Sequence, residues 1–206
     1  MGKVVVIDYC MGNTDSVLRA IEKCGGEPIL TNAASDFESA SHIILPGVGA
    51  FQKGMEHIDA LGIRSKLEEQ VFEHNIPFLG ICLGMQLLAE QGFEDGQNNG
   101  LGWIKGSVVK FEKSVKNESI PHIGWNEVNF GQESPLFEGM VSGKDYYFVH
   151  SYHFICNNSS NIIATTPYCG EFVSAVRKKN IFGVQFHPEK SQKNGFNVLK
   201  NFLAFA

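Results

Sequence analysis

The sequence predicts one α/β domain, in which a central, mostly parallel sheet is flanked by helices and carries an antiparallel elaboration in its C-terminal half. Over roughly the first 90 residues, short β-branched runs alternate with stretches of helical periodicity, which is typical of βαβ units. Between residues 102 and 185, short β-rich runs separated by turn signals indicate antiparallel strands. The 206 residues contain no repeat and no long linker, so we expect a single domain over 1–206.

The first half of the chain shows this alternation most clearly. Val4 to Ile7 is a short β-branched run that predicts a buried strand. Thr14 to Lys23 then has apolar residues at helical spacing and is closed by two glycines, as helices commonly are. The further strands that we expect here are 28–30, 42–45 and 77–80, and the further helices are 51–60, 64–74 and 83–91.

The second half is dominated by strand patterns and ends on a helix. Residues 178–180 predict a hairpin turn between two of the strands. Apolar residues at helical spacing predict a closing helix over 197–205. The strands that we expect are 107–111, 125–130, 146–149, 162–165, 172–177 and 181–186.

Composition excludes several classes of protein. With 43% hydrophobic residues, 19% charged residues and a net charge of -5, the chain is typical of a globular protein with no reason to bind nucleic acid or a membrane surface. It has no apolar run long enough to span a bilayer and no secretory signal at its start. Its five cysteines are odd in number and lack CxxC spacing, so we expect no disulfide framework, no metal site and a cytoplasmic location.

A candidate nucleophile lies in the segment Gly80-Ile81-Cys82-Leu83-Gly84. A buried strand that runs through G-x-C-x-G into a helix is the cysteine version of a nucleophile elbow, a sharp turn that lifts one side chain above the sheet edge. The start of the following helix would favour the reactive thiolate. The alternative is a buried structural cysteine, which is the more common role for a lone cysteine without this glycine pattern.

A candidate base and its orienting acid follow about 100 residues later, in His187-Pro188-Glu189. In an extended chain, residues i and i+2 point to the same face, and proline keeps the residue before it extended. Alone, this tripeptide fits a surface histidine equally well. Combined with Cys82, it gives the order nucleophile, histidine, acid that α/β folds with a catalytic triad use.

A third segment, Pro46-Gly47-Val48-Gly49, follows a predicted strand. Glycines at a strand end allow a backbone N–H to turn toward a developing oxyanion. The segment also fits an ordinary loop between a strand and a helix. It is a poor match to a phosphate-binding loop, because the third glycine and the Lys-Ser/Thr pair are missing.

Together these motifs resemble those of the triad-type, or class I, glutamine amidotransferases, which have a flavodoxin-like fold. Over nearly the whole chain, the sequence is most similar to the glutaminase subunits of imidazole glycerol phosphate synthases. The additional segments that carry this similarity are 11–13, 121–126, 147–152 and 187–191.

The resemblance implies a mechanism for glutamine hydrolysis. Cys82 would attack the side-chain amide of L-glutamine, His187 would transfer protons, and Glu189 would hold the imidazole. Backbone N–H groups of Leu83 and of the Val48-Gly49 segment would bind the oxyanion, after a peptide flip near Val48. The family needs no cofactor for this reaction, and we expect none here.

The resemblance also implies binding positions and a partner. Ammonia becomes protonated and diffuses away, so a glutaminase that feeds a synthesis must dock on an acceptor. The chain has no room for a second catalytic domain, so we expect a heterodimer with a cyclase, or synthase, subunit that makes imidazole glycerol phosphate and AICAR in histidine biosynthesis. The residues that would line the glutamine pocket are Gln86, Glu94, His150, Ser151 and Tyr152. Those that would face the partner are Trp125, Asn126, Tyr147 and Lys190.

Three alternatives remain open from the sequence alone. The same glutaminase motifs serve synthases that amidate an N-acetylated sugar for surface glycans, and Ser151-Tyr152-His153 departs from the Ser-Tyr-Tyr expected of the histidine enzyme. Without the resemblance, Trp125 and Tyr147 would fit core packing as well as an interface. The chain could also be an inactive flavodoxin-like binding module, although the combination of Cys82, His187 and an intact oxyanion segment argues against this.

Overall fold

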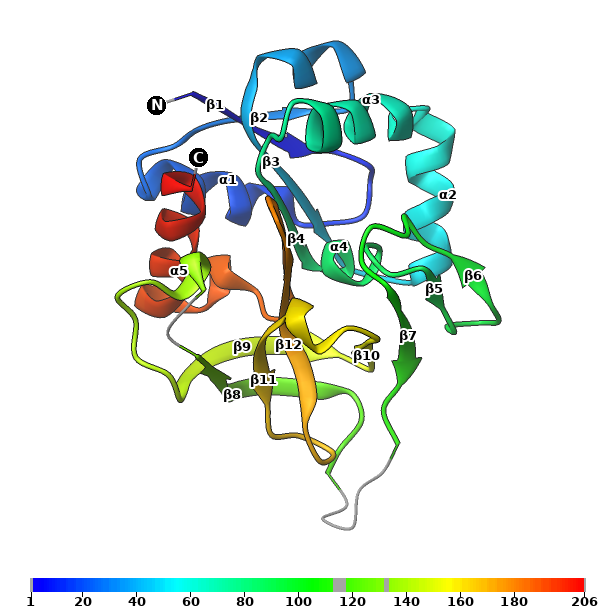
Figure 1. The fold of residues 1–206 in the computed structure, drawn as a ribbon, viewed down its shortest axis with the longest axis vertical. Coiled ribbons are helices and arrows are strands. Elements are labelled where there is room, and N and C mark those ends of the chain that lie inside the picture. Colours follow the sequence, from blue (N-terminus) through cyan, green and yellow to red (C-terminus); the bar gives the residue numbers. More distant parts are fainter. Residues whose placement is uncertain (1, 113–117, 132–133, 206) are drawn as a thin grey trace.

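A run of parallel strands forms the centre of the sheet in the computed structural model, which describes residues 2–112, 118–131 and 134–205 (Figure 1). The strands lie in the order β2, β1, β3, β4, β13, and each neighbouring pair is parallel. Their bounds are β1 (Lys3–Ile7), β2 (Glu27–Thr31), β3 (Ala40–Gly47), β4 (Phe78–Cys82) and β13 (Ile181–Val184). The predicted α/β class with a mostly parallel central sheet is thus confirmed.

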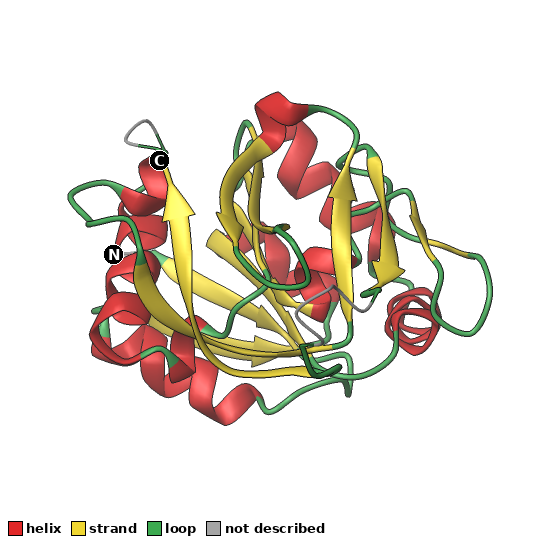
Figure 2. Cartoon of the chain, turned by 90° about the horizontal axis from the view of Figure 1, so that it is seen from below, coloured by secondary structure: helices red, strands yellow, loops and turns green. Residues whose placement is uncertain are grey.

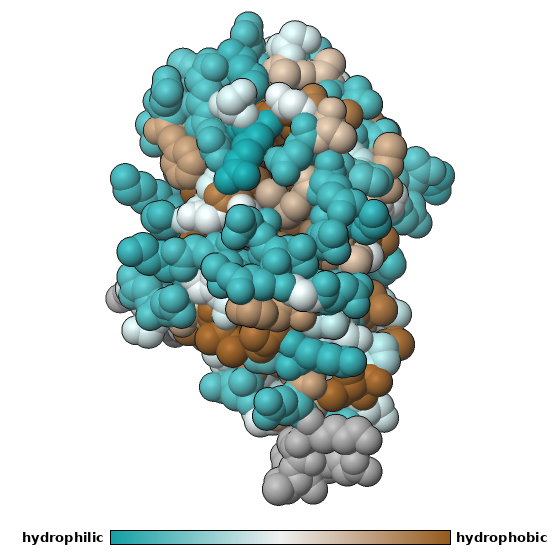
Figure 3. All heavy atoms as spheres, turned by 90° about the vertical axis from the view of Figure 1, so that its right-hand side faces the viewer, coloured by the Kyte–Doolittle hydropathy of each residue, from teal (hydrophilic) through white to brown (hydrophobic). Residues whose placement is uncertain are grey.

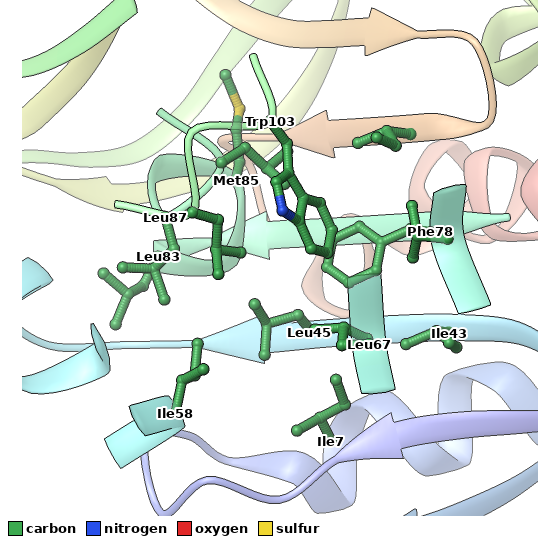
Figure 4. Close-up of a cluster of buried hydrophobic side chains, with 14 of the residues drawn as sticks. Ile7, Ile43, Leu45, Ile58, Leu67, Phe78, Leu83, Met85, Leu87 and Trp103 are labelled. Carbon is green, nitrogen blue, oxygen red and sulfur yellow. The ribbon is translucent and has the colours of Figure 1, made fainter. Parts of the chain in front are cut away.

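Helices cover both faces of these strands, because successive side chains of a strand point to opposite faces. Val4 and Val6 of β1 pack with α1 and α5, whereas Val5 and Ile7 pack with α2 and α3. Figure 4 shows the second of these cores, in which Ile7 lies close to side chains of β3 and of the covering helices. The helices are α1 (Thr14–Lys23), α2 (Phe51–Leu61), α3 (Arg64–Glu68), α4 (Leu83–Gln86) and α5 (Gln192–Ala204).

The antiparallel strands of the second half extend the sheet beyond β13 and form a curved second layer (Figure 2). β12 (Phe172–Lys178) pairs with β13 through the predicted hairpin turn, in which Lys179 has a φ of 57°. The path continues through β10 (Tyr152–Cys156), β7 (Gly106–Lys110), β5 (Gln91–Gly92) and β6 (Asn98–Asn99). The branch from β12 consists of β11 (Ile162–Thr166), β8 (His122–Phe130) and β9 (Lys144–His150).

The helix predicted over 83–91 is wrong in length, because α4 ends at Gln86. The next N–H groups bond three residues back, from Leu88 to Met85 and from Ala89 to Gln86, which tightens and ends the helix. The carbonyl groups of residues 87–89 then accept hydrogen bonds from the loop 101–104 instead of from a next helical turn. The leucine-rich pattern of residues 83–91 correctly indicated burial. The path of the backbone after Gln86 is instead determined by hydrogen bonds to the loop 101–104.

Smaller differences occur elsewhere. The helix predicted over 64–74 passes from α3 into a π-helical turn at Glu69–Glu73. The sequence did not predict β10, in which only Phe154 is buried, and α5 begins five residues before the predicted position. Within the described residues, no helix is long and apolar enough to cross a membrane. The face shown in Figure 3 is mainly hydrophilic, with small hydrophobic patches in its lower half.

Candidate active site

Cys82 lies at the sharp junction between β4 and α4, with φ 53° and ψ -107°. This is a strained conformation for a residue with a side chain, and such strain is typical of functional sites. The neighbouring glycines are required by close packing: a Cβ on Gly80 would lie 2.5 Å from the Gly84 carbonyl oxygen, and one on Gly84 would overlap the Leu45 carbonyl oxygen. The elbow is therefore fixed by backbone on both sides. Because α4 is only one turn long, its dipole offers little to the sulfur.

His187 and Glu189 form a buried pair, with Nδ1 2.8 Å from Oε1. The expected geometry was wrong, because β13 ends at Val184 and residues 188–190 form a 3₁₀ turn rather than extended chain. This turn brings the carboxylate back toward the ring. Ser191 fixes it further, since its Oγ donates to the His187 carbonyl oxygen at 2.6 Å.

The charge state of His187 depends on both neighbours. Burial disfavours the imidazolium, but the charge of Cys82 and the hydrogen bond and charge of Glu189 outweigh it and raise the pKa of His187 to about 10. A hydrogen-bond contribution from Cys82 also raises this pKa, because the sulfur lies close to the ring. Nevertheless, Nε2 is buried and forms no hydrogen bond of good geometry with any described residue. This ring nitrogen is thus available for a hydrogen bond to the thiol or to a bound molecule.

The Val48-Gly49 segment lies opposite the elbow, and its Val48 N–H group is not available to bind an oxyanion in this conformation. The Val48 N–H donates to the Met11 carbonyl oxygen at 2.6 Å. Gly49 has a φ of 111°, which favours glycine, and the Val48 side chain is 42% exposed. In this conformation the Val48 N–H is therefore engaged away from the pocket.

A pocket of about 390 Å³ lies between the Cys82 elbow and the Val48 segment, and His187 and Glu189 are not among its lining residues. Two larger surface pockets, of about 510 and 570 Å³, do not contain Cys82, so volume alone does not mark the site. The structure brings together in the smaller pocket the predicted nucleophile, the predicted oxyanion segment and every residue predicted to bind glutamine. Its lining is Val48, Gly49, Ala50, Cys82, Leu83, Gln86, Glu94, Val149, His150, Ser151 and Tyr152.

Hydrogen bonds fix the polar side chains of this pocket. Glu94 Oε2 accepts from the Phe51 N–H at 2.7 Å, at the start of α2. Gln86 Nε2 donates to the Gln185 Oε1 atom at 3.0 Å, and Gln185 Nε2 in turn donates to Cys82 Sγ at 3.6 Å. Gln185 was not among the predicted site residues. Its sequence signal was a polar residue inside the apolar run that leads to His187.

The residues predicted to face a partner divide into two sets. Trp125 is 48% exposed, so it is not a core aromatic; its ring lies 6.0 Å from that of Tyr147, over which Lys190 Nζ lies at 5.8 Å. Asn126 points to the opposite face of β8, where it donates to the Pro167 carbonyl oxygen at 3.3 Å. Within the described ranges, no cluster of side chains is suited to hold a metal ion.

Comparison with known proteins identifies the class of this chain. The family model "Glutamine amidotransferase class-I" matches residues 5–205. A solved structure of a glutamine amidotransferase shares the fold, with a TM-score of 0.75, 17% identity, and coverage of 97% of each chain. PurLQS from Thermotoga maritima gives a TM-score of 0.73 at 20% identity and covers 99% of each chain. The chain therefore belongs to the class I glutamine amidotransferases, as the sequence motifs predicted.

Relatives with higher identity carry a more specific name. Imidazole glycerol phosphate synthase subunit HisH 2 of Methanococcus maripaludis is 46% identical over 200 residues, which cover 97% of this chain and 98% of the relative. Subunit HisH 1 of Campylobacter jejuni is 44% identical with the same coverage. Subunit HisH of Aquifex aeolicus is 44% identical, with 97% of this chain and 95% of the relative covered. The predicted similarity to these glutaminase subunits is confirmed.

Proposed function

We propose that this chain is the glutaminase subunit of an imidazole glycerol phosphate synthase. It hydrolyses L-glutamine and passes the ammonia to a cyclase subunit that makes imidazole glycerol phosphate and AICAR in histidine biosynthesis. The observation that carries this proposal is the position of Cys82, which lines a pocket in a strained backbone conformation and lies close to the buried pair of His187 and Glu189. We propose further that residues 1–206 act as one domain and that the protein works in the cytoplasm.

The geometry supports a two-step hydrolysis. His187 Nε2 takes the thiol proton of Cys82, and Cys82 Sγ attacks the amide carbon of the glutamine side chain, forming a C–S bond. The same Nε2 atom then delivers that proton to the leaving nitrogen. The C–N bond breaks and ammonia leaves. Water, deprotonated by His187, then attacks the thioester, the C–S bond breaks, and glutamate is released. Glu189 accepts the Nδ1–H bond throughout, which fixes the tautomer that leaves Nε2 facing the reaction.

Each tetrahedral intermediate carries an oxyanion. The Leu83 N–H, at the start of α4, is one donor that we propose, since N–H groups in the first helical turn lack a partner within the helix. The second donor is an N–H of the Val48-Gly49 segment. The Val48 N–H is bonded to Met11 in the present conformation, so this donor requires a rearrangement of the peptide near Val48.

The acceptor of ammonia is a second polypeptide in this proposal. Trp125, Tyr147 and Lys190 supply an exposed aromatic and basic cluster on which the cyclase subunit would dock. The names of the relatives favour histidine biosynthesis over sugar amidation. His153, which departs from the expected family pattern, stacks on Phe111 with ring centroids 4.6 Å apart, so packing accounts for it without a change of partner.

The test is reconstitution with the cyclase subunit from the same organism. We expect AICAR formation with glutamine as nitrogen source, and formation of glutamate in equal amount. Ammonium at high concentration should replace glutamine, which shows that the cyclase itself is active. If the chain hydrolyses glutamine only with a sugar-amidating synthase, the pathway is wrong. If it hydrolyses glutamine with neither, the proposed activity is wrong.

A further inference from the structure

Two buried histidines connect strand β8 to the glutamine pocket: His122 belongs to β8, and His150 belongs to the neighbouring strand β9 and lines the pocket. Asn126 Nδ2 lies 3.3 Å from His122 Nε2, and His122 Nδ1 lies 3.0 Å from His150 Nε2. His150 Nδ1 lies 2.8 Å from the Tyr152 carbonyl oxygen. Both rings are buried, so these contacts are not replaced by water. Three side chains thus connect β8 to a backbone carbonyl of the pocket wall.

The chain of contacts continues from that carbonyl to the nucleophile. The Tyr152 carbonyl oxygen also accepts from Gln86 Nε2, at 3.1 Å. Since the same nitrogen donates to Gln185 Oε1, both of its hydrogens are used. Gln185 Nε2 then donates to the sulfur of Cys82. The orientation of Gln86 therefore depends on the position of the Tyr152 carbonyl group.

The hydrogens of both rings can be assigned independently from the two ends of this chain. A carbonyl oxygen only accepts, so His150 must carry its hydrogen on Nδ1, and its Nε2 must accept from His122 Nδ1. At the other end, Asn126 Oδ1 accepts from the Glu127 N–H and Asn126 Nδ2 donates to Pro167, which fixes the amide. Asn126 therefore donates to His122 Nε2, which places the hydrogen of His122 on Nδ1 as well.

The pKa values of His122 and His150 also indicate that each ring carries one hydrogen and is neutral. Burial lowers the pKa of His122 to about 4, against an opposing effect of the Glu118 charge. Burial also lowers the pKa of His150 to about 3; the hydrogen bond to the Tyr152 carbonyl opposes this, and charge on His122, His153 or His187 would add to it. Both rings are thus neutral near pH 7, as a chain with one donor and one acceptor on each ring requires.

We propose that His122 is a positioning residue for glutamine, which acts through His150 on the Tyr152 carbonyl group and so on Gln86. This inference rests on the proposed glutaminase function. His122 does not line the pocket itself, and its contribution is a single hydrogen on a defined atom. Loss of that hydrogen leaves His150 Nε2 unpaired, which releases the constraint that keeps the His150 Nδ1–H on the pocket wall.

The first test is nitrogen-15 NMR of the histidine rings in the full chain at pH 7. We expect His122 and His150 both to be neutral and protonated on Nδ1. A ring protonated on Nε2, or doubly protonated, would overturn the relay whatever the activity of the protein. Because this measurement needs no substrate, it separates the relay from the proposed function.

The second test is glutamine hydrolysis by variants with the cyclase partner bound. His122→Phe retains the aromatic packing against Tyr168 and Phe148 but removes the relay, so we expect a KM about tenfold higher with kcat changed by less than about threefold. His122→Asn restores a donor near the Nδ1 position and should return KM to within about threefold of the original value. His153→Phe is the matched control, because it belongs to the same aromatic cluster but not to the relay, and its KM should not change.

The possible results distinguish a role of His122 in positioning glutamine from a role in folding or packing. A lower kcat at unchanged KM in His122→Phe would indicate only a loss of folded enzyme and would overturn the proposal. An equal rise in KM in His153→Phe would attribute the effect to packing and would also overturn it. No hydrolysis by the unmodified chain with its partner would count against the glutaminase function, and the NMR result would then decide the relay alone.

Discussion

The elbow at Cys82 and the predicted oxyanion segment at Val48 line one pocket, yet they are constrained in different ways. At the elbow, added Cβ atoms on Gly80 and Gly84 would collide with backbone. At the opposite side, a Cβ on Gly49 would meet only the terminal methyl of Met11, at 3.0 Å. A short hydrogen bond from the Val48 N–H to the Met11 carbonyl oxygen holds Val48, whereas Gly47 before it belongs to β3, and a Cβ there would clash with the Tyr9 side chain.

This difference indicates where the activity can be controlled. The position of Cys82 is determined by the fold itself, so a partner has little scope to change it. The segment around Val48 can adopt another conformation at modest cost, because glycines flank it and its side chain is half exposed. We therefore expect that the elbow around Cys82, the fixed side, is required for hydrolysis under all conditions. The segment around Val48, the movable side, is expected to control the rate of hydrolysis in response to the partner.

The largest effect should come from Cys82→Ala. Without the nucleophile, glutamine hydrolysis should fall by about 10⁴-fold or more, whereas ammonia-dependent synthesis by the partner should remain. The measurement is the rate of product formation with glutamine and with ammonium. Hydrolysis close to the original rate would mean that another cysteine acts as nucleophile, and the elbow would lose its role.

The His187–Glu189 pair should show a graded effect. His187→Asn removes the group that transfers protons, so hydrolysis should fall by about 10⁴-fold. Glu189→Gln removes only the orienting carboxylate, and we expect a smaller loss, on the order of 10³-fold. Steady-state rates with the partner bound give the comparison. Equal losses in the two variants would contradict the separate roles, and full activity of Glu189→Gln would remove this residue from the site.

A pair of glycine substitutions compares the stability cost of a new side chain on the fixed side with the cost on the movable side. Gly84→Ala places a methyl group against the Leu45 carbonyl and should destabilise the fold by about 3 kcal/mol or more. Gly49→Ala meets only a side-chain end, and its positive φ should reduce stability by about 1 kcal/mol. Urea denaturation measures both. Equal destabilisation by the two substitutions would mean that the two sides are equally constrained.

The smallest effect concerns the pH dependence of stability and His122 of β8. His122 has a pKa below its ordinary value of 6.5, so the unfolded chain binds its proton first, and stability falls as pH drops from about 6.5 toward about 4. His122→Phe should therefore lose less stability than the original chain between pH 7 and pH 4.5. Urea midpoints at the two pH values provide the test. Identical losses would show that His122 is not held neutral.

Much of this molecule could be predicted from local patterns. The parallel strands other than β2 are largely apolar runs, and α1 begins and ends where periodicity and its closing glycines predicted. The elbow was predictable because its glycines and cysteine are adjacent in sequence. The predicted length of α4 was wrong because N–H groups of the loop 101–104, which is distant in sequence, donate hydrogen bonds to the carbonyl groups of residues 87–89.

The site beyond the motifs depends on contacts that no local pattern encodes. His187 and Glu189 were expected on an extended chain, and a 3₁₀ turn brings them together instead. Gln185 and His122 act, in our account, through hydrogen bonds to residues 103 and 28 positions away. Asn126 and Trp125 are neighbours in sequence, but strand alternation directs them to opposite faces of β8.

The most direct test of the central claim is glutaminase activity measured for the chain alone, with the cyclase partner, and with the cyclase partner plus its acceptor ligand. If the Val48 segment lacks a donor at rest, the chain alone should be slower by about 10²–10³-fold, since that is the effect of one missing oxyanion donor. We predict that activity rises at each addition and is highest with ligand bound. High activity of the isolated chain, unchanged by the partner, would show that the oxyanion hole is already formed and would contradict control by the movable side.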